Sequence, residues 1–417
     1  MDTSILRVRK SSLQGEIRLQ GAKNSALHLL TASLLTAERV VLTNYPKDLY
    51  DAQVHVGMLE ALGKTCRSDD NTIEIYETAA PTTRLVWPGR SIRNTLLILG
   101  SLFARVGYGA VPHPGGCDLG DRKYDIHVQV IEAFGGRVFE LGGDLCAERS
   151  GPLNACTLEL PIRSTGATEN ALLIASLAEG TSNIYNPHIR PEILNLIEML
   201  ELMGASITIH GQERIEVTGN PDGHSGARVN VIPDNMEALT WVAAAAMTGG
   251  QVLIHDFPYD HLEVPLIYMR ESGVRVFREQ RDAFVTASKC YPVEISTGPY
   301  PGINSDMQPI FAAFASQANG LSKIVDLRFP GRYQYAAEMQ KLGVEAGIEG
   351  DFLHVRGSRP LRGCNVTATD LRAGISLVLL GLVADGETRI HESWQIFRGY
   401  ENFLAKIRSL QGNVDAG

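Results

Sequence analysis

Six glycines recur at intervals of 69 to 72 residues along this 417-residue chain. Each follows an amphipathic, helix-like run and precedes a short run with the composition of a β-strand. Glycine is favoured just past the last turn of a helix, because it adopts a left-handed conformation there without a Cβ clash. The glycines are Gly63, Gly135, Gly204, Gly273, Gly343 and Gly412. This regularity predicts six copies of one structural unit.

Each copy also contains a second helical run, which is apolar nearly all round and therefore predicts a buried helix. These runs begin near Asn24, Arg93, Glu169, Met236, Met307 and Arg372. Each unit then has the order β-α-β-α-β-β. Three units can gather their apolar helices inside a shell of sheet, so six units predict two similar α/β domains, each large enough for its own core.

The composition excludes several classes of protein. A net charge of −9 argues against general nucleic-acid binding. The first twenty residues lack the apolar run of a signal peptide, and the most apolar stretch, residues 373–384, is too short to cross a bilayer. The six cysteines lie far apart without a CxxC pair, so we expect neither a disulfide framework nor a metal site, and a cytoplasmic location. The sequence gives no oligomeric state.

Charged and amide residues open most of the apolar helices, where they do not help packing. Helix N-termini carry unpaired N–H groups and partial positive charge, so they suit anionic ligands. Equivalent helix starts would meet at one end of each domain, and we expect a ligand cleft lined by them. The residues are Lys23, Asn24, Arg93, Asn94, Glu169, Asn170, Asp306, Gln308, Asp370 and Arg372. A purely architectural role for six duplicated units is the alternative.

Seven motifs in order along the chain resemble one family: GAKNSAL (21–27), PGGCDLGDRKYDIH (114–127), STGATEN (164–170), VIPDNMEA (231–238), PYPGINSDMQP (299–309), ATDLRAG (368–374) and FRGYEN (397–402). The family is the UDP-N-acetylglucosamine 1-carboxyvinyltransferases, within the superfamily that includes the shikimate-pathway enolpyruvyl transferase. The resemblance implies two inside-out, barrel-like α/β domains with buried central helices. One domain would span 22–230. The other would combine 1–21 with 231–417, because the first strands complete it.

The resemblance also implies an activity. The enzyme would transfer the enolpyruvyl group of phosphoenolpyruvate to the 3-hydroxyl of UDP-N-acetylglucosamine and release phosphate, the first committed step of peptidoglycan precursor synthesis. It implies small-molecule substrates alone, and we expect no metal and no organic cofactor. Such enzymes are targets of fosfomycin.

The catalytic residues implied by the motifs are Cys117, Asp306, Lys23, Asp370 and Arg398. Cys117 would add to phosphoenolpyruvate and assist as an acid or in product release, since nearby cations lower the pKa of a thiol and make it nucleophilic. The other five cysteines are interpreted as structural. Asp306 would take the proton of the acceptor hydroxyl. Its position before an apolar helix is also typical of a helix N-cap, and the two roles are compatible. Asp370 would orient cations or exchange a proton at the substrate methylene.

The substrate-binding residues implied by the motifs form two sets. Phosphoenolpyruvate carries a phosphate and a carboxylate, which the planar fork of arginine binds well. Its candidates beside Lys23 and Arg398 are Arg93, Arg122, Arg332 and Arg372. The UDP-sugar would be held at its diphosphate by Ser164, Thr165 and Gly166, at its sugar by Asn24, and at its uracil by the segment from Arg122 to Asp125.

Some acceptor-side positions depart from the common family pattern. They are Asn94, Lys123, Tyr124, and Pro330-Gly331 before Arg332. One alternative is therefore a paralogue that acts on UMP or another UDP-sugar. The other is a non-catalytic regulator that binds a UDP-sugar, although the retained Cys117, Asp306 and cation set argue against it.

Overall fold

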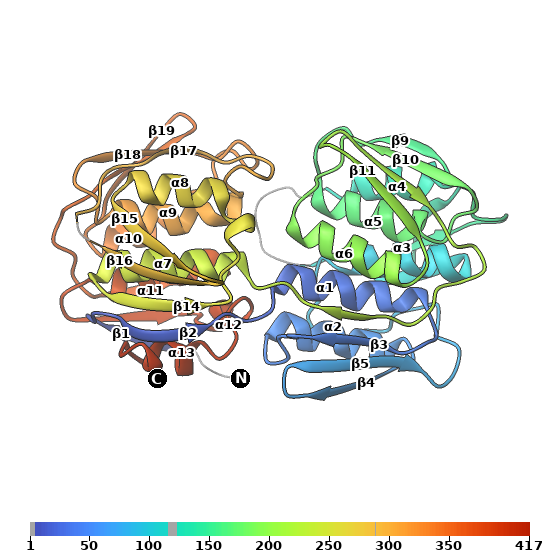
Figure 1. Cartoon of the computed structure of the whole chain (residues 1–417), viewed down its shortest axis with the longest axis horizontal. Coiled ribbons are helices and arrows are strands. Elements are labelled where there is room, and N and C mark those ends of the chain that lie inside the picture. Colours follow the sequence, from blue (N-terminus) through green and yellow to red (C-terminus); the bar gives the residue numbers. More distant parts are fainter. Residues whose placement is uncertain (1–4, 116–122, 288) are drawn as a thin grey trace. The chain divides into compact units, whose positions relative to one another are not determined.

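The structure is a computed structural model that describes residues 5–115, 123–287 and 289–417. The chain forms two compact units (Figure 1). The N-terminal unit is Gly21–Ile232. The C-terminal unit is Pro233–Gly417 together with the residues up to Gln20.

The N-terminal unit alternates helices and short strands. Its helical elements are α1 (Lys23–Ala32), η1 (Ser33–Leu35), α2 (Tyr50–Ala61), α3 (Thr95–Val106), α4 (Asp125–Ala133), α5 (Thr165–Ala175) and α6 (Pro191–Leu202). Its strands are β3 (Val40–Thr43), β4 (Lys64–Asp69), β5 (Thr72–Glu77), β6 (Tyr108–Pro112), β7 (Arg137–Leu141), β8 (Asp144–Glu148), β9 (Thr157–Glu159), β10 (Thr181–Tyr185), β11 (Ser206–His210), β12 (Arg214–Thr218) and β13 (Arg228–Asn230).

The C-terminal unit has the same plan. Its helical elements are α7 (Asn235–Thr248), η2 (Tyr259–His261), α8 (Glu263–Glu271), η3 (Ser305–Met307), α9 (Gln308–Ala315), α10 (Tyr335–Lys341), α11 (Leu371–Gly381), α12 (Trp394–Phe397) and α13 (Phe403–Ser409). Its strands are β1 (Ile5–Arg9), β2 (Gln14–Arg18), β14 (Gln251–His255), β15 (Val274–Glu279), β16 (Asp282–Ala287), β17 (Glu294–Ser296), β18 (Leu321–Val325), β19 (Glu345–Glu349), β20 (Phe352–Arg356), β21 (Asn365–Thr367), β22 (Glu387–His391) and β23 (Asn413–Ala416).

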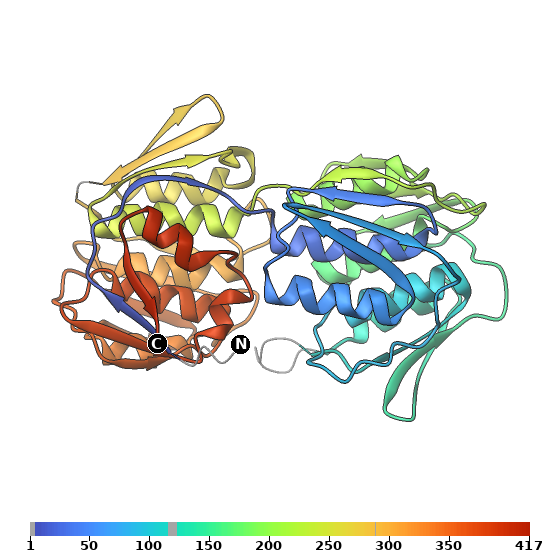
Figure 2. The ribbon, with the colours of Figure 1, turned by 90° about the horizontal axis from the view of Figure 1, so that it is seen from below.

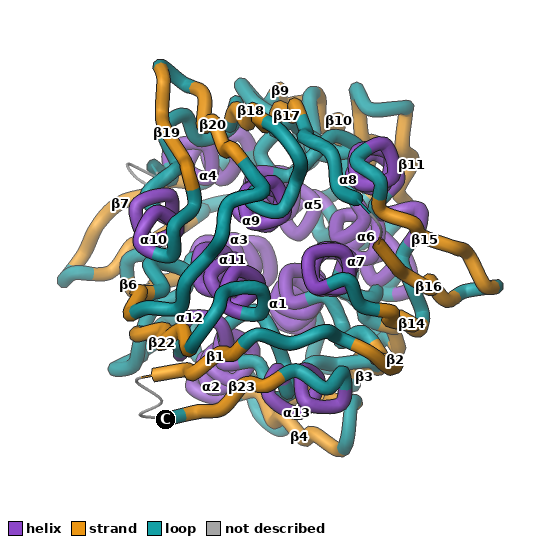
Figure 3. The backbone as a smooth tube through the Cα atoms, turned by 90° about the vertical axis from the view of Figure 1, so that its left-hand side faces the viewer, coloured by secondary structure: helices purple, strands orange, loops and turns teal. Residues whose placement is uncertain are grey.

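Each unit is built around three nearly fully buried helices: α1, α3 and α5 in the first, and α7, α9 and α11 in the second. Figure 3 shows α7, α9 and α11 near the middle of the C-terminal unit, with the strands outside them. Each unit has one hydrophobic core. The remaining helices keep a polar face toward solvent, as in α8, where only Pro265, Leu266 and Met269 are buried. The expected inside-out α/β fold is confirmed.

In each unit, strands that lie far apart in the sequence pair within one sheet. Strand β2 pairs in parallel with β14 of the C-terminal unit, and β13 pairs in parallel with β3 of the N-terminal unit. Strand β1 lies between β22 and β23 in the sheet of order β21-β22-β1-β23 (Figure 2). The first two strands therefore complete sheets whose other strands lie more than two hundred residues later in the chain.

The second copy of the unit departs from the pattern. Its sheet has three strands, in the order β6-β8-β7, whereas the other five sheets of the described residues have four. The missing strand is reduced to one parallel bridge between Arg84 and Ala110. The segment before α3 contains Pro81 and the pair Pro88-Gly89, which favour turns over a strand.

Five of the six repeat glycines take the left-handed conformation expected after a helix, with φ between 80° and 116°. The prediction is wrong for Gly412. There Gln411 follows the C-cap of α13 and has φ 63°. Gly412 is needed for another reason, since a Cβ would lie 2.7 Å from Cγ1 of Ile407.

The start of α5 differs from the expected position near Glu169. The helix begins at Thr165, because the Ser164 side chain accepts a hydrogen bond from Ala167 N and caps it.

Among the described residues, no helix combines the length and the apolar character needed to cross a membrane.

Candidate active site

Two inner helices of the C-terminal unit, α7 and α11, begin at capping side chains. Asp234 accepts hydrogen bonds from Met236 N at 2.8 Å and Glu237 N at 3.0 Å at the start of α7. Asp370 accepts from Arg372 N at 2.7 Å and Ala373 N at 3.0 Å at the start of α11. Asp370 is thus a helix cap whose own helix carries Arg372. Helices α7, α9 and α11 pack on one another, so these starts belong to one packed group.

Asp306 lies on η3, between Arg332 and Arg372, two arginines expected to bind phosphoenolpyruvate. Its Oδ1 accepts from Arg332 Nη1 at 2.9 Å, and its Oδ2 accepts from Arg372 Nε at 3.3 Å. Burial alone would raise the pKa of the Asp306 carboxyl, but the charges and hydrogen bonds of both arginines hold that pKa well below its ordinary value. The capping role considered for Asp306 falls instead to Asn304, which accepts from Asp306 N at 2.9 Å.

Both arginines are buried and charged. Burial opposes the charged form of each, but the charge of Asp306 helps to raise the pKa of Arg332, and Tyr400 and Asp306 raise that of Arg372. The Arg372 guanidinium lies 5.9 Å from the ring centroid of Tyr400, and its Nη1 is 3.5 Å from the Tyr400 hydroxyl. Two fixed guanidinium groups can bind an anion bidentately.

Asp326, which no sequence motif predicted, organises the loop that carries Arg332. Its buried carboxylate accepts hydrogen bonds from Thr297 Oγ1, Ser305 Oγ and Gln308 Nε2, and from the backbone N–H groups of Arg328 and Phe329. Ser305 Oγ in turn accepts from Arg332 Nη1 at 3.0 Å. The one available signal was an aspartate placed directly after an apolar strand.

Arg398 follows α12 and is 3% exposed. Its Nη1 donates to Gln395 Oε1 at 3.0 Å, and its guanidinium lies 6.0 Å from the Trp394 ring centroid. These contacts orient a third buried guanidinium in the C-terminal unit.

In the N-terminal unit, Lys23 is the first residue of α1 and is buried. Its Nζ lies 2.6 Å from Oδ2 of Asp51 on α2, and both side chains are at most 10% exposed. Asp51 was not predicted, because an aspartate in the first turn of a helix is common for reasons of helix stability alone.

Two buried histidines, His28 and His55, lie near this pair. His28 Nδ1 lies 2.9 Å from Oε1 of Glu169, which is buried on α5. His55, one turn beyond Asp51 on α2, is fully buried, and its Nε2 is 3.3 Å from Thr31 Oγ1. Burial, together with the charge of His28, lowers the pKa of His55 to about 3. His55 is therefore neutral at physiological pH.

The start of α5 places the predicted diphosphate-binding residues beside two further buried histidines. Ser164 caps the helix, and Thr165 Oγ1 lies 2.8 Å from His188 Nδ1. A Cβ on Gly166 would stand 3.0 Å from Nε2 of His127, so glycine fits this close approach. The backbone N–H groups of a helix start suit an anion such as a diphosphate.

The remaining predicted positions are spread over the N-terminal unit. Asn24 is the half-buried second residue of α1. Arg93 precedes α3, and its Nη2 donates to Lys123 O at 2.8 Å. Asp125 is the exposed first residue of α4. Cys117 and Arg122 lie outside the described residues.

The other five cysteines are free thiols. Burial raises the pKa of Cys66 to about 12 and that of Cys156 to about 11, and it also raises the pKa values of Cys290 and Cys364. A raised pKa leaves little thiolate at neutral pH, which agrees with a structural interpretation of these four.

Comparison with known proteins connects this geometry to a family. The pattern of the family described as EPSP synthase (3-phosphoshikimate 1-carboxyvinyltransferase) matches residues 8–407. The chain is 34% identical over 419 residues to UDP-N-acetylglucosamine 1-carboxyvinyltransferase 1 of Caldanaerobacter subterraneus, covering 99% of both chains. It is 36% identical over 414 residues to UDP-N-acetylglucosamine 1-carboxyvinyltransferase 2 of Carboxydothermus hydrogenoformans, covering 97% of both.

A solved structure shows the same fold. The enolpyruvyl transferase NikO from Streptomyces tendae matches with a TM-score of 0.89 at 24% identity, over 99% of this chain and 98% of that one. With a family pattern spanning nearly the whole chain and full-length relatives above 30% identity, the assignment is plain: the chain belongs to the EPSP synthase family and is a carboxyvinyltransferase.

Proposed function

We propose that the protein transfers the enolpyruvyl group of phosphoenolpyruvate to the 3-hydroxyl of UDP-N-acetylglucosamine. The observation that carries the chemistry is the placement of one half-exposed carboxylate, Asp306, between two buried arginines, Arg332 and Arg372. The arginines offer positive charge to phosphoenolpyruvate, which has two anionic groups. The carboxylate can accept the proton of the acceptor hydroxyl. The names of the full-length relatives support the acceptor.

The proposed reaction is an addition followed by an elimination. The acceptor oxygen bonds to C2 of phosphoenolpyruvate while its proton passes to Asp306, and C3 takes up a proton from an acid of the site. The tetrahedral adduct then loses a C3 proton and its phosphate, by cleavage of the C2–O bond, which restores the double bond. Cys117 is our candidate for the acid, and Asp370 for the exchange of the C3 proton.

The other assignments follow the family motifs. Lys23, Arg93, Arg122 and Arg398 would complete the cation set for phosphoenolpyruvate. Ser164, Thr165 and Gly166 would hold the diphosphate, Asn24 the sugar and Asp125 the uracil. The reaction changes no oxidation state and its charges can be met by arginine, so we propose that it needs no metal and no organic cofactor.

Release of phosphate from phosphoenolpyruvate tests the proposal directly. The assay is run with UDP-N-acetylglucosamine, UDP-glucose, UMP and no acceptor, each with and without EDTA. We expect release only with UDP-N-acetylglucosamine, unaffected by EDTA. Release with UMP alone would favour the UMP-specific paralogue, and no release with any nucleotide that binds would favour the non-catalytic regulator.

A further inference from the structure

Both carboxylate oxygens of Asp306 are engaged by arginines. Oδ1 accepts from Arg332 Nη1 at 2.9 Å, and Oδ2 accepts from Arg372 Nε at 3.3 Å. Within the described residues, the carboxylate has no other hydrogen-bond or ion-pair partner. A carboxylate that accepts from two guanidinium groups is a poor proton acceptor, because both groups stabilise its charged form. In this arrangement Asp306 is not ready to take a proton from a hydroxyl.

We infer that phosphoenolpyruvate itself frees Asp306, because its phosphate and carboxylate replace the Asp306 carboxylate on Arg332 and Arg372. Asp306 then turns to the acceptor hydroxyl. This inference rests on the proposed function. It adds that the two arginines hold Asp306 in an unreactive state, which we call the lock, until phosphoenolpyruvate binds. Proton removal is thereby confined to the state in which the group to be transferred is already bound.

Burial indicates which partner moves. The side chains of Arg332 and Arg372 are 5% and 2% exposed, whereas that of Asp306 is 31% exposed. Asp306 also lies on η3, a single turn of 3-10 helix. A half-exposed carboxylate on a short turn can change rotamer at small cost, whereas two buried guanidinium groups cannot leave their pockets without losing packing and hydrogen bonds. The arginines therefore stay, and the carboxylate exchanges.

Each arginine keeps other partners when Asp306 leaves. Arg332 Nη1 also donates to Ser305 Oγ at 3.0 Å, and its backbone carbonyl accepts from Gln308 Nε2 at 3.0 Å. The Arg372 guanidinium packs over the Tyr400 ring. The positions of both cations are thus fixed without Asp306, as an anion-binding pair requires.

Five other titratable groups lie near the cluster. Asp234 at the start of α7 and Asp370 at the start of α11 accept backbone N–H bonds, and Asp326 after β18 accepts five hydrogen bonds. Burial holds Tyr335 of α10 and Tyr400 neutral by raising their pKa values. These groups have fixed partners or are uncharged, so the electrostatic change on substrate binding falls on Asp306.

Carboxyl carbon NMR of the full-length protein tests the lock. Aspartate is labelled with ¹³C at the carboxyl carbon, and the Asp306 signal is identified by its loss in Asp306→Asn. The probe is 2-phospholactate, which keeps the phosphate and carboxylate of phosphoenolpyruvate but lacks its double bond, and no nucleotide is added. In the free protein we expect the signal to stay at its carboxylate position throughout the pH range in which the protein is folded. With the probe bound, we expect the Asp306 carboxyl to titrate. Its acid dissociation constant should be about 10- to 1000-fold lower than in the free protein.

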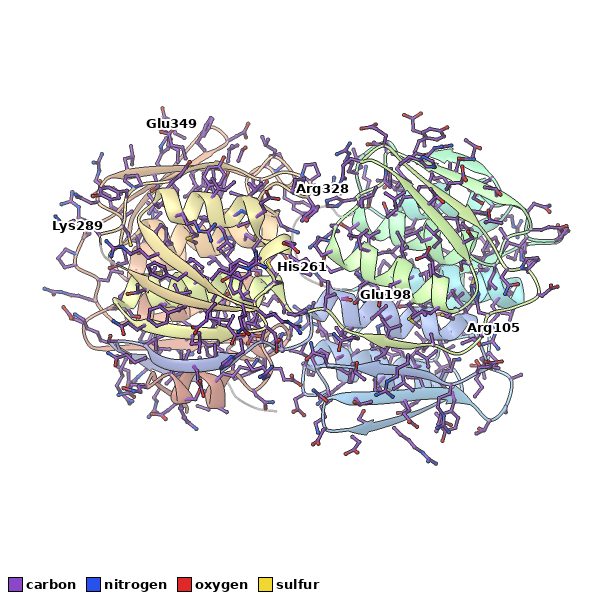
Figure 4. All side chains as sticks on the ribbon, in the orientation of Figure 1. Arg105, Glu198, His261, Lys289, Arg328 and Glu349 are labelled. Carbon is purple, nitrogen blue, oxygen red and sulfur yellow. The ribbon has the colours of Figure 1, made fainter. Side chains whose placement is uncertain are left out.

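The control variant is Arg328→Gln, which removes one positive charge from the same loop at an exposed position (Figure 4). It should show the same change on probe binding as the unmodified protein. If calorimetry shows that 2-phospholactate binds while the Asp306 signal does not move, the lock is refuted and the proposed function stands. If neither 2-phospholactate nor phosphoenolpyruvate binds even with UDP-N-acetylglucosamine present, both are overturned.

Discussion

At the scale of single residues, each unit contains a charge pair with at least one buried member. In each, one member comes from the start of an inner helix: Lys23 with Asp51, and Arg372 with Asp306. Removing one partner of such a pair leaves a charge in a poorly solvated place, and this penalty is larger than the worth of a surface ion pair. Substitutions at these sites should therefore be tested both for their effect on the free energy of unfolding and for their effect on the reaction.

Asp306→Asn should keep nucleotide binding but lose turnover, because the amide can still form hydrogen bonds yet cannot take up the proton. We expect kcat to fall by about 10² to 10⁴. Calorimetry with UDP-N-acetylglucosamine and steady-state phosphate release would measure the two properties separately. A variant that keeps more than a tenth of the original kcat would exclude Asp306 as the base.

Asp51→Asn should destabilise the N-terminal unit by about 3 kcal/mol, since it removes the carboxylate charge 2.6 Å from a buried ammonium group. It should also raise KM for phosphoenolpyruvate, because Lys23 would lose the carboxylate that positions it. The matched control is Glu60→Gln on the exposed side of the same helix, which should change stability by less than about 0.5 kcal/mol. Urea unfolding gives both values, and equal effects would argue against the pair.

His55 should make the protein sensitive to acid. Its pKa is about 3 in the folded state and about 6.5 when unfolded. Above pH 6.5 both states are neutral at this residue. Below it the unfolded state binds the proton first, so stability falls between about pH 6.5 and pH 3, by about 2 kcal/mol at pH 5. Urea unfolding of His55→Gln between pH 7.5 and pH 5 should show a shallower decline. An unchanged slope would mean that His55 takes up its proton without unfolding.

At the scale of helices and strands, periodicity and turn chemistry predicted most of the architecture. The glycine positions identified five helix ends, because only a left-handed residue fits there. They failed at Gly412, since the sequence does not reveal that Gln411 takes the strained conformation and that the glycine relieves a close approach to Ile407. Ser164 likewise looked like part of a binding loop alone, although it also starts α5.

The site was harder to predict than the fold. Motif matching found Asp306, Arg332 and Arg372 separately, and the structure adds that they contact one another. Asp51 and Asp326 were missed, because pairing between distant segments depends on packing that no local pattern records. Family resemblance named residues by role, whereas their partners are set by the tertiary structure.

Gln411→Gly should stabilise the C-terminal unit by about 0.5 to 1 kcal/mol, because glycine adopts a positive φ without a Cβ clash. The neighbouring change Gly412→Ala should destabilise it, since the new Cβ would meet Ile407 Cγ1 at 2.7 Å and Ile407 O at 2.9 Å. Thermal unfolding of the pair decides the point. The two variants should change the stability in opposite directions. A change in the same direction for both would contradict the assignment of the left-handed position to Gln411.

At the scale of the whole molecule, the chain is threaded so that its first strands belong to the later unit. Strand β1 is an inner strand between β22 and β23, whereas β2 is at a sheet edge. An inner strand supplies hydrogen bonds to both neighbours, so its loss leaves an unpaired edge on two strands rather than on one.

Deletion of residues 1–20 should therefore unfold the C-terminal unit while leaving the N-terminal unit protected. Hydrogen exchange followed by peptide mass spectrometry would show fast exchange in β22 and β23 and slow exchange in α3 and α5. Two proline substitutions, Val8→Pro in β1 and Glu16→Pro in β2, provide a graded comparison. Proline removes an N–H donor, and the inner-strand change should be the more damaging. Uniform loss of protection in both units would contradict this division.

The same chain path determines the order in which the paired strands are synthesised. Residues 5–9 are made nearly four hundred residues before their partners, residues 387–391 and 413–416. At about 5 to 20 residues per second, the nascent strand waits about 20 to 80 s before it can pair. Gly21–Ile232, which contains all the strands of its own sheets, can fold in that interval. The C-terminal unit can be completed only after residues 387–416 have been made, so the cell has to keep strand β1 unpaired until then.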